Sequence, residues 1–428
     1  MKYGPCLLVL VASVAGAEPY DFEPIRYEST PARDPVSRLQ ERITAGKVKL
    51  RFDSTRGYLD ALLAALDIPI SSQGLVFSKT SFQPKHISPE TPRAIYFSDD
   101  AYVGWVQGGD VIEISAVDPN LGAVFYTLDQ RPQVAPKFVR RAEDCLQCHT
   151  SALAQSVPGH LVRSVYADAD GHPLLRAGTS VSDHRTPLQR RWGGWYVTGT
   201  HGGQEHLGNV VFFSGAESGI PEPKGAQGSN LVNLEGRFET APYLSPKSDI
   251  VARMVLDHQA HMHNLITRAA YRTRIALHET DSFGDSKQQK VDPLSPIVQR
   301  RVARAGEPLV RYLLMAEEAP LTAPVRGGTS FTANFQSRGP RDGRGRSLRD
   351  LDLQTRLFRY PCSYLIYSQA FDRLPRPMLD YVYRRLGEIL TGKDRSETFA
   401  SLSTEDRRAI LQILRETKPS LPAALKGE

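Results

Sequence analysis

The chain has 428 residues, a formal net charge of +6 at pH 7 and 40% hydrophobic residues. Its length exceeds the size at which one hydrophobic core usually stops growing, so we expect two or three domains. The composition is that of an ordinary globular protein, which excludes a fibrous or a disordered chain. No later segment approaches the roughly 20 apolar residues that a membrane helix needs, so we expect no membrane span.

The amino terminus has the pattern of a cleaved signal peptide. Lys2 precedes an apolar stretch from Cys6 to Val14, and three small residues close the pattern at Ala17. We therefore expect residues 1–17 to be removed, which leaves an exported, periplasmic protein that is soluble after cleavage. Cys6 stands too early in the apolar stretch to be the site of a lipid anchor.

Loss of the signal peptide removes the charge of Lys2 and leaves a basic mature chain of net charge +5. Nucleic acid is not expected as a partner of an exported protein. The basic balance therefore indicates acidic protein partners or anionic surfaces, approached under electrostatic attraction.

The pattern of apolar residues divides the mature chain into three regions and predicts an α+β fold. Residues 18–135 form a β-rich region in which helices are expected over 35–46 and 56–66, followed by short strands between 74 and 128. Residues 136–246 are expected to be α+β, with a helix from Phe138 to His149. The strands predicted in that region are 161–166, 174–178, 194–198 and 209–213, with a hairpin turn at Asp170-Gly171.

Residues 247–428 are predicted to be mostly helical. Residues 249–278 contain neither Gly nor Pro and carry one apolar stripe at helical spacing, and 279–293 have the polar composition of a linker. Further helices are expected over 297–304, 308–317, 351–371, 377–391 and 404–416, with a loop rich in Gly and Arg over 320–349.

Three cysteines remain in the mature chain: Cys145, Cys148 and Cys362. An odd number argues against a disulfide framework. Apolar residues follow Cys362, so we expect this thiol to be buried as a small hydrophobic group. Cys145 and Cys148 are then left as a pair.

The pair belongs to the sequence Cys145-Leu146-Gln147-Cys148-His149, in which two cysteines are three positions apart and a histidine follows directly. Two thiols one helical turn apart can each form a thioether with a haem vinyl group, and the adjacent histidine then reaches the iron. This pattern resembles the haem-attachment motif of the c-type cytochromes. The resemblance covers these five residues and their flanks. It implies one covalent haem c, attached through Cys145 and Cys148, with His149 as proximal iron ligand.

Three other interpretations of the pair stay open. A structural zinc site would need a further Cys or His ligand at recognisable spacing, and no second paired motif is present. A dithiol redox pair would favour a thioredoxin-like βαβ context, which the pattern does not show. Chance occurrence is the third, since the motif is short.

The residue on the distal side of the haem would decide between electron transfer and ligand binding. His258 and Met262 lie one turn apart on the predicted helix 249–278 and are the distal candidates, although a core methionine and a hydrogen-bonded histidine explain them as well. His160 and His184 remain possible. The Gly- and Trp-rich segment 191–209 either packs against the macrocycle or forms a tight strand pair.

The sequence therefore predicts a periplasmic monohaem c-type cytochrome-like protein that passes single electrons to and from a redox partner protein. The alternatives are a haem-based redox or gas sensor or binding module, since residues 162–173 loosely resemble the hairpins of PAS and Cache sensor domains, and a peroxidase-like haem enzyme with an open distal site. No catalytic residue is identified. The arginines between 338 and 349 form either a docking loop for an acidic partner or a solvated loop.

Overall fold

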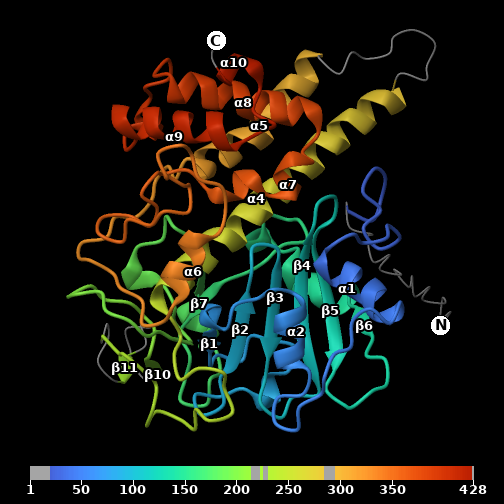
Figure 1. Ribbon diagram of the computed structural model, residues 1–428, viewed down its shortest axis with the longest axis vertical. Helices are drawn as coiled ribbons and strands as arrows, with labels where there is room; N and C mark the ends of the chain where they lie inside the picture. The colour runs from blue at the N-terminus through green and yellow to red at the C-terminus, as the bar shows by residue number, and fades with distance from the viewer. Residues whose placement is uncertain (1–19, 214–221, 225–229, 284–294, 427–428) are drawn as a thin grey trace, which may run out of the picture.

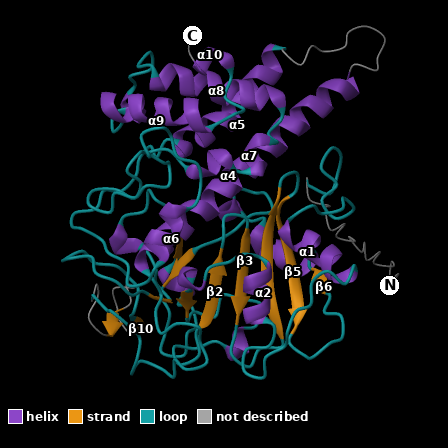
Figure 2. Ribbon diagram, in the orientation of Figure 1, coloured by secondary structure: helices purple, strands orange, loops and turns teal. Residues whose placement is uncertain are grey.

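The computed structural model describes residues 20–213, 222–224, 230–283 and 295–426. The expected signal peptide and most of the expected linker, residues 284–293, lie outside these ranges. The α+β class is confirmed, because a seven-stranded antiparallel sheet occupies the amino-terminal half and helices dominate the carboxyl-terminal half (Figures 1 and 2).

The sheet has the strand order β6-β5-β4-β3-β2-β1-β9, and each neighbouring pair is antiparallel. The strands expected between residues 74 and 128 are all present. The strand bounds are β1 Gly74–Val76, β2 Arg93–Phe97, β3 Ala101–Trp105, β4 Val111–Asp118, β5 Gly122–Asp129, β6 Phe138–Arg140 and β9 Trp195–Tyr196.

Both faces of the sheet are buried, each in a different hydrophobic core. Side chains alternate between the faces, so Tyr96 and Val103, which are paired, share one face, and Phe97 and Tyr102 share the other. The first face packs with the helices α1 Pro35–Thr44 and α2 Leu59–Ala65. The second face packs with the long helix α4 Ile250–Phe283 and the helices that follow it. The sheet therefore separates the amino-terminal helices from the carboxyl-terminal half.

The start of α1 is fixed by Asp34. Its carboxylate accepts hydrogen bonds from the backbone N–H groups of Val36 and Ser37, which satisfies donors that a helix terminus leaves unpaired. The same carboxylate accepts the hydroxyl of Tyr126 on β5. This cap therefore also ties α1 to the sheet.

Two expectations about the second region are wrong. Phe138–Arg140 is strand β6, and the helix that carries the cysteines, α3 Glu143–His149, begins only after it, because β6 gains hydrogen bonds by pairing with the edge of β5. The expected strand 174–178 is the 3₁₀ turn Leu175–Ala177, and β7 pairs with the following residues instead. The bounds of the short strands are β7 Arg163–Val165, β8 Thr179–Val181, β10 Val211–Phe213 and β11 Glu222–Lys224.

The helical region also differs from expectation at three places. Residues 296–313 form one helix, α5, through Pro308, because its apolar stripe packs along α4 and offsets the lost backbone hydrogen bond. The expected helix 351–371 is mostly loop, and the expected loop 320–349 contains a short helix, α6. The remaining bounds are α6 Phe331–Ser337, α7 Gln369–Asp372, α8 Arg376–Leu390, α9 Thr404–Thr417 and α10 Ala423–Lys426.

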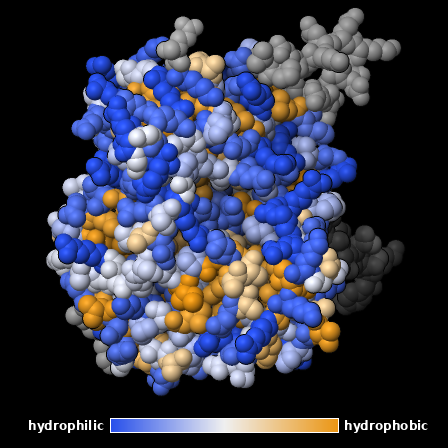
Figure 3. All heavy atoms as spheres, viewed as in Figure 1, coloured by the Kyte–Doolittle hydropathy of each residue, from blue (hydrophilic) through white to orange (hydrophobic). Residues whose placement is uncertain are grey.

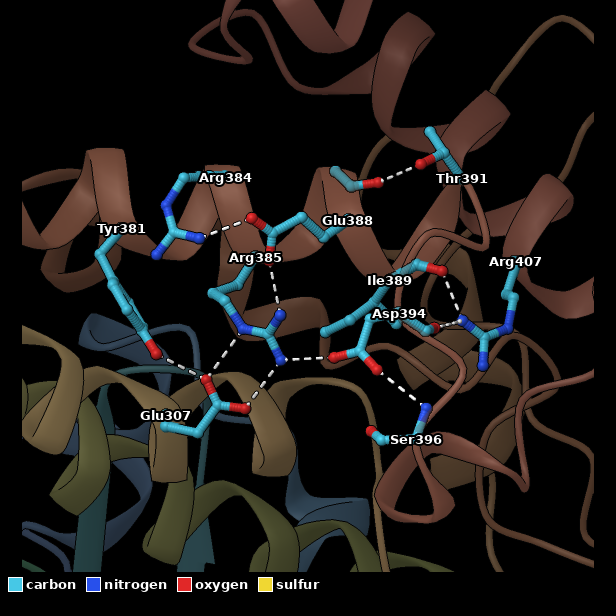
Figure 4. Close-up of polar contacts among 11 residues, drawn as sticks. Glu307, Tyr381, Arg384, Arg385, Glu388, Ile389, Thr391, Asp394, Ser396 and Arg407 are labelled. Atoms are coloured by element: carbon cyan, nitrogen blue, oxygen red, sulfur yellow. Dashed lines mark hydrogen bonds and ion pairs between the residues drawn. The ribbon is translucent and has the colours of Figure 1, made fainter.

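An ion-pair network ties α8 to α5. The guanidinium of Arg385 on α8 lies 3.0 Å from the carboxylate of Glu307 on α5, 2.6 Å from Glu388 and 2.7 Å from Asp394 (Figure 4). Hydrophilic side chains cover much of these helices on the face drawn in Figure 3, whereas hydrophobic patches gather lower, over the sheet.

Helix α4 carries a buried charge network in the centre of the molecule. Asp257 is fully buried, accepts the indole N–H of Trp192 at 2.8 Å, and lies 3.4 Å from the guanidinium of Arg253 and 3.8 Å from that of Arg191. Arg253 is itself 1% exposed and stacks on the ring of Trp195 at 3.5 Å. The two buried arginines therefore depend on one carboxylate.

We expect Asp257→Ala to lower the free energy of unfolding by about 3–5 kcal/mol, because it leaves buried guanidinium groups without a counter-charge. Asp257→Asn keeps an acceptor for Trp192 and serves as the matched variant, with a smaller loss. Urea unfolding followed by circular dichroism measures both. An Ala variant as stable as the parent would show that the network contributes nothing to folding.

Candidate functional site

Helix α3 presents the two cysteines on consecutive turns. Cys148 is exposed, Cys145 is half-buried, and neither forms a disulfide. Acidic residues in the first turn suit the positive end of the helix. Cys362 is completely buried, as expected from its apolar neighbours, and burial raises the pKa of its thiol to about 12. The structure therefore separates a pair of thiols that is at least partly exposed from one thiol that is fully buried.

The surroundings of Cys145 do not favour a thiolate. Burial, followed by the charge of Glu113, raises the pKa of the Cys145 thiol to about 11. Reactive and zinc-binding cysteines act as thiolates and usually have a lowered pKa. Glu113 is paired with Arg93 at 2.9 Å, and the Nε atom of Arg93 is buried without a hydrogen-bond partner. The charges of Glu113 and Arg93 act in opposite directions on the pKa of the Cys145 thiol.

The ring of His149 is held in one orientation. Its Nδ1–H donates to the carbonyl oxygen of Gly159 at 2.8 Å, and its ring packs against Phe125 with centroids 4.5 Å apart. Burial lowers the pKa of His149, so the ring is neutral near pH 7. A backbone carbonyl on one ring nitrogen is typical of metal-binding histidines, since it fixes the tautomer that leaves a lone pair on the other nitrogen. Nε2 is therefore the nitrogen that suits a metal.

The Gly159 carbonyl is held in turn by α4. Asn264 accepts the backbone N–H of His160 and donates to its carbonyl, both at 2.7 Å. A Cβ atom at Gly159 would collide with the Asn264 side chain, so the close approach requires glycine. The His160 ring packs on Tyr102, with centroids 4.2 Å apart, and lies 5.9 Å from His263 of α4. Asn264 thereby positions the group that orients His149.

The expected distal residues lie on another side of α4. His258 is fully buried, with Nδ1 2.9 Å from His184 Nδ1 and Nε2 2.8 Å from the hydroxyl of Ser363. Its position is five residues from His263, which at 100° per residue places the two side chains about 140° apart around the helix. Met262 is fully buried in the core. Both ring nitrogens of His258 already have hydrogen-bond partners. Distal ligation by His258 or Met262 stays a prediction.

Sequence reasoning missed the clamp formed by Gly159, His160 and Asn264. One signal was available in the sequence: His263, Asn264 and Thr267 are polar residues in a stretch that contains no Gly or Pro. The structure buries all three side chains. The Trp-rich segment packs mainly on α4, through Trp192 with Asp257 and Trp195 with Arg253. The structure thus brings that segment to the charge network of α4.

Among the described residues, one group of three side chains could hold a metal ion: Asp168, Asp170 and His172. These residues are half-buried or exposed, and the carboxylate of Asp168 already accepts the N–H groups of the other two. The group does not include Cys145 or Cys148. The cysteine pair therefore has no zinc-type ligand set in the described part of the chain.

No family model, curated protein or solved structure gives a significant match to the chain. Across the described ranges, the helices are too short or too polar to cross a lipid bilayer.

Buried histidines make the fold sensitive to acid. Burial lowers the pKa of His258 to about 3 and the pKa values of His261 and His263 to about 4, although Asp183 opposes this shift at the first two rings. The unfolded chain protonates such rings near pH 6.5, so it binds more protons than the folded chain between about pH 6.5 and pH 4. Stability is therefore present above this window and is lost as the pH falls through it.

We expect urea unfolding midpoints to drop between about pH 7 and pH 5, with each such ring contributing about 1.4 kcal/mol per pH unit well below pH 6.5. The variant His258→Gln removes one of these rings and is expected to have a shallower pH dependence than the parent. A midpoint that stays constant over this range would contradict the assignment of these rings as neutral in the folded chain.

Proposed function

We propose that this protein is an exported, periplasmic monohaem c-type cytochrome-like protein that transfers single electrons. The observation that carries the proposal is the geometry of α3, where one exposed and one half-buried thiol lie one turn apart, beside a histidine whose Nδ1 is bonded to a backbone carbonyl. When bound, haem c supplies an iron that changes its oxidation state by one electron.

Each residue of the site has a distinct part in this proposal. Cys145 and Cys148 would hold the macrocycle through thioether bonds, and His149 would offer the Nε2 lone pair to the iron. The Gly159 carbonyl, held by Asn264, keeps the His149 ring aligned and raises its basicity. Arg93, whose charge acts on Cys145, also suits the group, because its buried Nε–H has no acceptor and a haem carboxylate would be one.

The other interpretations of the cysteine pair have less support. A dithiol redox pair or a zinc site needs a thiolate, and burial raises the pKa of the Cys145 thiol. Thioether formation, by contrast, leaves a neutral sulfur that suits a half-buried position.

A haem-based sensor or ligand-binding module is the second candidate. Nδ1 of His149 is bonded to the Gly159 carbonyl, so Nε2 is the nitrogen that would hold the iron. Both ring nitrogens of His258 already have partners, so a small external ligand could bind at the haem in place of this residue. A high-spin spectrum that shifts with carbon monoxide would favour binding, and a low-spin six-coordinate spectrum would favour electron transfer.

The first test is covalent attachment. We expect protein made in a host with cytochrome c maturation to keep haem through denaturation and to give the pyridine haemochrome spectrum of haem c. The double variant Cys145→Ala, Cys148→Ala is expected to lose the haem, because no thioether can form. The matched control is Cys362→Ala, which removes the buried thiol and keeps the haem. Haem loss from the denatured parent would overturn the proposal.

The second test concerns the distal side. We expect Met262→Leu, which conserves volume and costs less than about 1.5 kcal/mol, to leave the absorption spectrum of the haem-loaded protein unchanged. His149→Ala should instead change the spectrum while the thioethers keep the haem attached. A spectral shift in Met262→Leu equal to that in His149→Ala would establish Met262 as an iron ligand.

A further inference from the structure

We propose that an arginine surface on α4 and α5, formed by Arg268, Arg272 and Arg304, is the docking surface for an acidic redox partner. The redox activity of the partner rests on the haem function proposed above, whereas the binding of carboxylate groups by the arginines does not.

The three arginines lie together on neighbouring helices. Arg268 and Arg272 are one turn apart on α4, and Arg304 is on α5, which packs along α4. Burial, followed by the charges of Arg272 and Arg304, lowers the pKa of Arg268. The two helices run side by side (Figure 1). Arg268 is half-buried, and the other two are exposed. No carboxylate of the described residues forms an ion pair with any of them, so their charges repel one another.

The arginines that the sequence singles out as a docking loop are in a different state. Arg341 pairs with Asp350 at 3.0 Å, and Arg346 pairs with Asp342 at 2.7 Å. Arg338 and Arg349 pair with Asp67 and Asp99 on other segments of the chain. This loop is therefore largely neutralised from within, whereas the arginine surface is not. An unpaired cluster gains the most from an external anion.

The arginine surface also lies near a cavity that the segment after the cysteine motif helps to line. A polar cavity of about 110 Å³ is lined by Gln155, which follows His149 by six residues, together with Leu265 of α4 and Pro308 of α5. On each helix the cavity is one turn from the arginine surface, since Leu265 precedes Arg268 and Pro308 follows Arg304 by a turn. A partner bound there would rest against the segment that follows the cysteines.

The feature of the partner that the arginine surface would recognise is a group of carboxylates. Arginine forms two parallel hydrogen bonds to a carboxylate, and a set of like charges attracts an oppositely charged surface before contact. Three arginines across two helices match a patch of several Asp and Glu side chains on a folded partner. An anionic lipid surface is the competing ligand, and the test separates the two.

The test measures binding of the full-length protein to a poly-L-glutamate peptide by fluorescence anisotropy at several salt concentrations. The variant is Arg268→Gln, Arg272→Gln, Arg304→Gln. The control has the same change in net charge at three exposed arginines elsewhere, Arg51→Gln, Arg190→Gln, Arg373→Gln. We expect the affinity of the variant to fall about tenfold or more, with a weaker salt dependence, and that of the control to change little.

Equal losses in variant and control would overturn the proposal, since net charge alone would then explain binding. Binding of phosphatidylserine vesicles that depends on the same three arginines, without binding of the peptide, would replace the protein partner by a membrane surface. The peptide measurement is repeated on Cys145→Ala, Cys148→Ala. Retained binding there, together with haem loss from the parent, would leave the docking surface standing and remove only its redox role.

Discussion

The hydrogen-bond clamp between Asn264 and His160 is the constraint on which the candidate site depends. Both backbone groups of His160 are bonded to one side-chain amide, so the preceding carbonyl has a single position. That carbonyl sets the tautomer and direction of His149. The orientation of a residue on α3 is therefore decided by a residue on α4, more than a hundred positions later in the chain. The short segment from Cys145 to His149 therefore has a defined geometry only because the two halves of the fold meet here.

Helix α4 can act in this way because it is buried on nearly all sides. A helix inside a protein is normally apolar, yet this one buries Arg253, Asp257, His258 and Asn264 within three turns. Arg253 and Asp257 contact the Trp-rich segment, His258 contacts a carboxyl-terminal loop, and Asn264 contacts the residues after the cysteines. The polar groups therefore specify which segment packs on which side of α4. The hydrophobic cores supply most of the stability, and these polar contacts fix the position of each segment on α4.

The sequence predicted the secondary structure correctly where a single periodicity of apolar residues was present. The strands between residues 74 and 128 and the helix over 249–278 follow from alternation and from helical spacing. It failed where tertiary pairing outweighed local preference, as in Phe138–Arg140, which extends the sheet edge, and in α5, which continues through Pro308. At the site, the cysteines and His149 were readable because the motif is contiguous. Gly159 and Asn264 were not, because their roles arise from a contact between distant segments, which one sequence does not encode as a pattern.

The last strand of the sheet has a consequence for how the chain matures. β9 follows the cysteines in sequence but pairs with β1, so Leu75 meets Tyr196 across more than a hundred residues. Contacts of such long range form slowly, since the entropy of closing the loop is lost before the contact repays it. The segment with Cys145 and Cys148 lies inside that loop. Under the haem proposal, the order of strand closure would thus set a period during folding in which both thiols can still be reached by an attachment enzyme.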